Sequence, residues 1–139
     1  MTDSPNLDLV RSIYAAWGRG DWSRTDWADS EIEFVIADGP QPEAVRGVTA
    51  MARSWREFLG ALEQYAIHVE DCREIGDERV LVTVRVAGRG KTSGVDLARI
   101  SPRAANVLHF RDGKVTRFVL YWDREHAFAD LGLDRGPVR

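Results

Sequence analysis

Apolar side chains recur at helical spacing near the start of the chain. The spacings of three, four and seven residues predict an amphipathic helix over residues 5–17. Ser4 followed by Pro5 is typical of a helix start, because serine caps the first turn and proline fits the first helical position. The predicted apolar face of this helix consists of Val10, Ile13, Tyr14 and Trp17.

The next part of the chain predicts two more helices around one strand. Residues 21–27 fit a short helix whose Trp22 and Trp27 pack beneath the first. Residues 31–37 form a β-branched and aromatic run that predicts a strand, and residues 41–47 fit a loop. A third helix is predicted to begin near Thr49, with Met51, Trp55, Phe58 and Leu62 on one face.

From residue 65 onward the pattern alternates and predicts strands over 65–75, 79–87, 95–110 and 115–122. Gly76-Asp77 predicts one connecting turn, and Asp112-Gly113 is a strong signal for a type I′ hairpin turn. Pro102 predicts a bulge or bend, because proline cannot donate to a strand ladder. Asp123 is expected to cap a short final helix that ends at Gly132.

This order of elements predicts a single α+β domain over residues 1–139, in which a curved, mostly antiparallel sheet wraps around three helices. The 44% hydrophobic and 29% charged residues are typical of a globular protein. The net charge of -3 is scattered, so a nucleic acid or a membrane surface is not an expected partner. The chain shows neither a transmembrane run nor a signal peptide, which predicts the cytoplasm.

Metal and disulfide chemistry are not predicted. Cys72 is the only cysteine, so one chain offers neither an internal disulfide nor a thiolate cage. Three histidines without close paired spacing do not predict a metal site. His68 and His109 are expected on the outer face of the sheet.

A set of short motifs resembles the NTF2-like superfamily, also called cystatin-like, over nearly the whole chain. The likeness is to its SnoaL-like and ketosteroid-isomerase-like branch. It rests on the order and spacing of the motifs, since one such scaffold hosts isomerases, cyclases, dehydratases, hydrolases and binders. The motifs are Tyr14-Ala15-Ala16-Trp17, Gly20-Asp21-Trp22, Gly47, Ser93-Gly94, residues 106–110, Arg111-Asp112-Gly113-Lys114-Val115, Tyr121-Trp122-Asp123-Arg124 and Leu131-Gly132-Leu133.

The resemblance implies a cone with an apolar pocket between its helices and its sheet. Aligning the Asp-Gly-Lys turn places Asn106 where the isomerases carry a protonated acid. An ungapped alignment places Val35 where they carry the catalytic base, and a loop insertion of a few residues places Asp38 there instead. Tyr14 lies one residue from the position of the catalytic tyrosine, where Ile13 is in register. Expected substrate-binding residues are Trp17, Phe34, Trp55, Phe58, Leu108, Phe118, Leu120 and Trp122.

Each catalytic candidate also has an ordinary structural interpretation. Asp38 fits a turn residue in Asp-Gly-Pro as well as a partly desolvated base. Tyr14 fits a core aromatic as well as a hydroxyl donor. Asn106 shares an inward face with Leu108 and Phe110, where an amide must find a partner or bind a ligand.

Two functions therefore remain open. The first is a cofactor-independent enzyme, a ketosteroid-isomerase-like isomerase or a SnoaL-like polyketide cyclase or dehydratase. It would act on a small apolar carbonyl compound, with Asp38 as base and with Asn106 and Tyr14 stabilising the oxyanion. The second is a non-catalytic binder of small ligands or an assembly module. The resemblance also implies a homodimer through the outer face of the sheet.

Overall fold

The computed structural model describes residues 4–39, 42–96 and 103–132. A mixed six-stranded sheet has the strand order β2-β1-β6-β5-β4-β3. Among the described strands, only β1 and β6 pair in parallel, and the other pairings are antiparallel. The elements are α1 (Pro5–Gly18), β1 (Ala28–Ile36), β2 (Glu43–Arg46), α2 (Val48–Gly60), β3 (Leu62–Ile75), β4 (Arg79–Gly90), β5 (Ala104–Arg111), β6 (Lys114–Tyr121) and α4 (Arg124–Leu131).

Local sequence signals fix several element boundaries as predicted. The Ser4 hydroxyl accepts a hydrogen bond from the Leu7 amide at the start of α1. Asp123 caps α4 through the Glu125 amide, and Gly132 ends α4 with a left-handed backbone. Asp112 and Gly113 both have positive φ, as a type I′ turn between β5 and β6 requires.

Two predicted elements are wrong. Residues 21–27 form an irregular segment instead of a short helix. Residues 43–46 form the edge strand β2 instead of continuing a loop, because they pair with β1. The predicted bulge at Pro102 lies outside the described residues.

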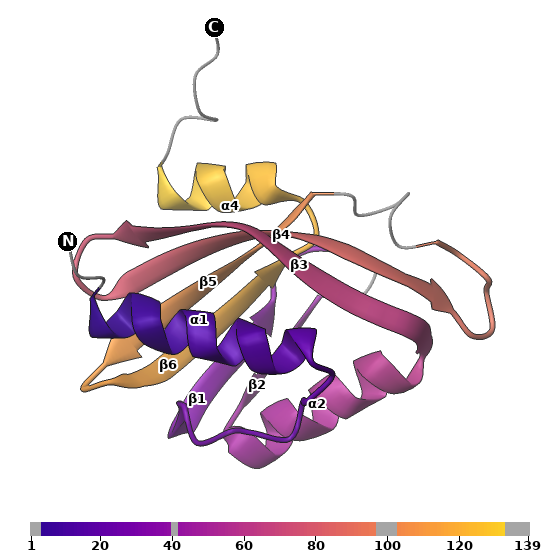
Figure 1. The fold of residues 1–139 in the computed structure, drawn as a ribbon, viewed down its shortest axis with the longest axis horizontal. Coiled ribbons are helices and arrows are strands. Elements are labelled where there is room, and N and C mark those ends of the chain that lie inside the picture. The colour runs from indigo at the N-terminus through magenta and orange to yellow at the C-terminus, as the bar shows by residue number, and fades with distance from the viewer. Residues whose placement is uncertain (1–3, 40–41, 97–102, 133–139) are drawn as a thin grey trace, which may run out of the picture.

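The two faces of the sheet pack against different helices. The concave face packs its aliphatic and aromatic side chains against α1 and α2. The convex face contributes Leu81, Val107 and Val119, among others, to a smaller cluster with Ala127 of α4. Figure 1 shows α4 on the side of the sheet opposite to α1 and α2. The sheet therefore curves around two helices, and the third helix covers its outer face.

Polar contacts fasten α4 to that outer face. The guanidinium of Arg124 is almost buried and donates to Glu70 of β3, at 2.6 Å, and to the Val84 carbonyl of β4, at 3.0 Å. Tyr121 donates to Asp130 at 2.7 Å. The predicted dimer through this face stays a prediction. Within the described residues, no helix is both long enough and apolar enough to cross a lipid bilayer.

The stability of a Leu108 variant tests whether this residue belongs to the hydrophobic core. Its side chain is fully buried on the concave face, so Leu108→Ala is expected to lower the free energy of unfolding by about 2–5 kcal/mol. Urea denaturation measures this change. Val95→Ala, at a position 42% exposed, is the control and is expected to change the free energy by less than about 0.5 kcal/mol. A Leu108→Ala protein as stable as the control would contradict this assignment.

Candidate functional site

A buried pair of polar side chains lies on the concave face of the sheet. Asn106 is the third residue of β5 and pairs across the sheet with Val82 and Leu120, whose side chains share its face. Its side-chain Nδ2 donates to the Tyr14 hydroxyl of α1 at 2.5 Å. Burial raises the pKa of the Tyr14 hydroxyl, so this hydroxyl stays neutral. The contact joins two of the predicted catalytic residues.

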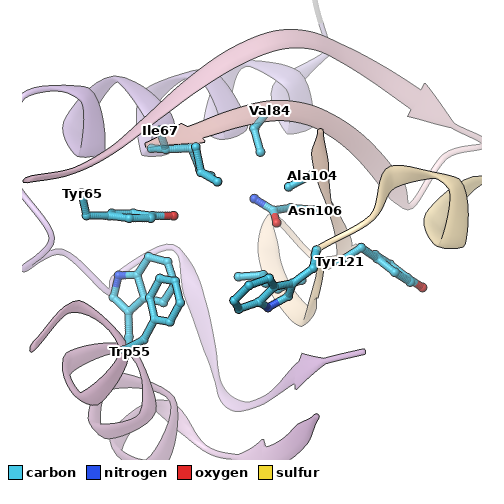
Figure 2. A pocket seen from close by; sticks show the side chains of 11 residues that line it. Trp55, Tyr65, Ile67, Val84, Ala104, Asn106 and Tyr121 are labelled. Carbon is cyan, nitrogen blue, oxygen red and sulfur yellow. The ribbon is translucent and has the colours of Figure 1, made fainter. Parts of the chain in front are cut away.

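Asn106 also lines a small hollow, which we call the Asn106 hollow. Its volume is about 30 Å³, which is room for one or two water molecules. Figure 2 shows the Tyr65 hydroxyl pointing across this hollow towards Asn106. The lining residues are Trp55, Phe58, Tyr65, Ile67, Val84, Val86, Ala104, Asn106, Leu120, Tyr121 and Trp122.

Tyr65 is a candidate site residue that the sequence analysis missed. Its ring contacts Trp55 and Phe58 edge to face, and burial raises the pKa of its hydroxyl. The signal was present in the alternation of Tyr65 with Ile67, which also lines the hollow. That spacing places both side chains on the inner face of β3.

Aromatic rings pack together around Trp55 beside the Asn106 hollow. Trp55 contacts the rings of five neighbours, at centroid distances from 5.4 to 6.3 Å. These ring contacts are with Trp17, Trp22, Phe34, Phe58 and Tyr65. The Asn106 hollow is small because these rings pack against one another.

A second, larger hollow lies beside Trp55, and we call it the tryptophan hollow. Its volume is about 460 Å³. The predicted substrate-binding residues Trp17, Phe34 and Phe118 line this hollow instead of the Asn106 hollow, and Trp55 lines both. The other lining residues are Trp22, Ser23, Arg24, Thr25, Trp27, Met51, Ala52, Arg56 and Leu59.

The predicted substrate-binding residues thus divide into three groups. Trp55, Phe58, Leu120 and Trp122 line the Asn106 hollow. Leu108 lines neither hollow, because it is fully buried in the core. The remaining ones belong to the tryptophan hollow.

Asp38 does not line either hollow. Its Oδ1 accepts a hydrogen bond from the Trp122 backbone amide at 2.6 Å, and its Oδ2 accepts from the Asp123 amide at 3.2 Å. Oδ2 also lies 2.7 Å from Nδ1 of His126. The carboxylate therefore fastens the end of β6 and the start of α4 to the turn after β1.

The same turn positions the side chain of Trp122. A Cβ atom on Gly39 would lie 2.7 Å from the Trp122 indole, and Gly39 has a φ of +90°. Only glycine fits a position with that φ and that close a ring. Asp38 and Gly39 together hold Trp122 where it forms a wall of the Asn106 hollow.

The side chains that line both hollows are neutral or basic. Among the described residues, no aspartate or glutamate lines either one. Within the same described part of the chain, no group of three or more histidine, cysteine or acidic side chains could hold a metal ion. The arrangement offers an amide and a phenol for hydrogen bonding to a ligand, inside walls that are mainly apolar.

The Asp38–His126 contact predicts a pH dependence of stability. The hydrogen bond to Asp38, with support from Asp123 and Asp130, raises the pKa of His126 above its ordinary value of 6.5. A histidine with a raised pKa in the folded state stabilises fully below its unfolded pKa, and the stabilisation is lost as the pH rises through the folded pKa. We expect His126→Gln to lose the most stability below pH 6.5, and progressively less above it.

Urea denaturation of both proteins from about pH 5.5 to about pH 8.5 measures this difference. His68→Gln, at an exposed position of β3, is the control for replacing a histidine elsewhere. A stability difference between wild type and His126→Gln that is the same at every pH would contradict the prediction.

Comparisons with known proteins agree with the fold. A family model described as "SnoaL-like domain" matches residues 10–118. An NTF2-like protein of unknown function from Burkholderia pseudomallei superposes with a TM-score of 0.73 at 18% identity, over 91% of this chain and 97% of that one. No curated protein sequence matches the chain significantly.

Two further solved structures are similar over 91% of this chain, each with a TM-score of 0.63 and 20% identity. One, from Xanthomonas campestris pv. campestris, is provisionally named a polyketide cyclase, and 96% of its chain is covered. The other is AclR from Streptomyces galilaeus, provisionally named a hydroxylase, with 94% of its chain covered. Identities at this level establish a shared fold, and the names describe those proteins only.

Proposed function

Because the chain belongs to the SnoaL-like domain family of the NTF2-like superfamily, we propose that it binds a small, largely apolar molecule through an oxygen atom at Asn106. The observation that carries this proposal is the Asn106 amide itself. The residue is 2% exposed, and its side chain bonds within the described residues to Tyr14. An amide has two donors and two acceptor positions, so part of its capacity faces the hollow.

A ligand oxygen at this amide would satisfy its remaining hydrogen-bonding positions. A buried polar group without its hydrogen bonds costs about 1–3 kcal/mol. A ligand whose carbonyl or hydroxyl oxygen bonds to the amide avoids that cost, whereas a purely apolar ligand in the Asn106 hollow would not. The hydroxyl of Tyr14 supports either orientation of the amide, because a hydroxyl donates as well as accepts.

The size of the hollow limits what enters it. About 30 Å³ accommodates the oxygen-bearing end of a molecule. The apolar remainder would lie in the mouth of the hollow against Trp55, Phe58 and Trp122, whose rings line it. A small ketone, or a flat polycyclic compound with one ketone at its edge, fits this description.

Catalysis is the alternative, and the names of the structural neighbours are its support. A carboxylate would take a proton next to the ligand carbonyl, the electron pair of the C–H bond would form a C=C bond, and the carbonyl oxygen would become an oxyanion held by Asn106. Asp38, the predicted base, bonds to two backbone amides and to His126 instead. The geometry therefore supports binding better than proton abstraction.

Replacement of the amide tests binding. Asn106→Leu keeps a similar volume and removes the hydrogen-bonding groups, so the Kd for a bound ketone is expected to rise roughly tenfold. Isothermal titration calorimetry with a panel of steroid-like and polyketide-like ketones measures this change. Asn6→Leu, on α1 and outside both hollows, is the control. Unchanged affinity in a folded Asn106→Leu protein would refute recognition by the amide.

Exchange of ketone hydrogen atoms with the solvent distinguishes binding from catalysis. A bound ketone kept in D₂O takes up deuterium next to its carbonyl when a base removes the proton there. We expect no exchange above the rate in buffer for either wild type or Asp38→Asn, as followed by NMR. Exchange that wild type accelerates and Asp38→Asn abolishes would replace the binding function with an enzymatic one.

A further inference from the structure

The tryptophan hollow has the size and the walls of a ligand site of its own. Its volume of about 460 Å³ falls in the usual range for small-molecule sites, unlike the Asn106 hollow. The walls are flat rings: Trp17 and Trp22 stack with their planes 24° apart and their centroids 5.4 Å apart. Parallel ring faces favour a planar guest, because offset stacking brings its ring into contact over a large area.

This hollow exists because residues 21–27 do not form the predicted helix. They run as an irregular segment past the end of α1, and the hollow lies between this segment and α2. The segment is fixed in place: the Trp27 indole donates to the Arg24 carbonyl at 2.9 Å, and Lys114 donates to the Asp26 carbonyl. The wall that Trp22 and Trp27 provide is therefore a built part of the fold.

The charged side chains that line the tryptophan hollow are positive. Its lining includes Arg24 and Arg56, and none of the described lining residues is acidic. Arg24 contacts Asp26 at 3.0 Å, which offsets part of its charge. Arg56 is exposed on α2 and has no ion pair with another described residue, so its guanidinium is available to an anion.

From these walls and charges, we propose that the tryptophan hollow binds a planar aromatic compound that carries one carboxylate or sulfonate group. The rings of the compound lie in the hollow against the indoles that line it, and the anionic group reaches Arg56 at the rim. This site is separate from the recognition of an oxygen at Asn106, and either one can be present without the other.

Two fluorescent probes test the proposal with the full chain. The anionic probe is 8-anilinonaphthalene-1-sulfonate, and the neutral probe is N-phenyl-1-naphthylamine, which has the same rings without the sulfonate. Energy transfer from tryptophan to each probe reports binding next to the indoles. We expect the anionic probe to bind about threefold to tenfold more tightly than the neutral one at low salt.

Three variants identify where and how the probes bind. Arg56→Gln is expected to weaken the anionic probe about threefold to tenfold and to leave the neutral probe unchanged. Arg53→Gln removes an exposed arginine from the same helix outside the hollow and is expected to change neither Kd. Ala52→Trp fills the hollow from α2 and is expected to abolish binding of both probes.

The outcomes decide the proposal. The proposal is supported if Arg56→Gln loses the preference for the anionic probe and Arg53→Gln keeps it. Equal binding of the two probes to wild type, or equal effects of Arg56→Gln and Arg53→Gln, overturns the anionic class of ligand. Full binding of both probes by a folded Ala52→Trp protein overturns the site itself. Because Arg56→Gln alters an exposed side chain, the test stands even where Ala52→Trp does not fold.

Discussion

The packing of aromatic rings between the concave sheet and two helices is the constraint on which this structure depends. Trp55 is its centre, since rings from α1, β1, β3, α2 and the segment after α1 all contact it. Burial of such rings supplies a large share of the apolar contact in a domain of this size. The same rings set the space that is left for a ligand, so stability and binding are decided by one set of side chains.

The packing of these rings also explains why the interior contains two separate hollows. One hollow is small and is lined by Asn106, whose amide bonds to Tyr14 behind the wall, and the other is large, mainly apolar and bordered by arginine. Recognition of a ligand oxygen needs a few hydrogen-bonding atoms in a defined geometry, whereas stacking of aromatic rings needs a large contact area. A single scaffold offers both environments because Trp55 contributes to both walls.

The alternation of residues along the strands was sufficient to predict which side chains face inward. Asn106 follows from its spacing to Leu108 and Phe110, and the Asp112–Gly113 turn fixes the register of the last hairpin. The direction of Asp38 did not follow, because partners 84 to 88 residues away determine it. Residues 21–27 were mistaken for a helix because the local sequence does not show that Trp22 and Trp27 both pack against Trp17, and these ring contacts suit an irregular segment.

The position of α4 also affects how two copies of the chain would meet. A second molecule that approaches the convex face encounters a helix fastened by Arg124 to two strands, where bare strands would otherwise offer a flat surface. Pairing over the part of the face that α4 covers would use the outer side of α4 as its contact or would break the contacts of Arg124, Tyr121 and Asp38. A helix of eight residues thus covers part of the surface through which the predicted dimer would form.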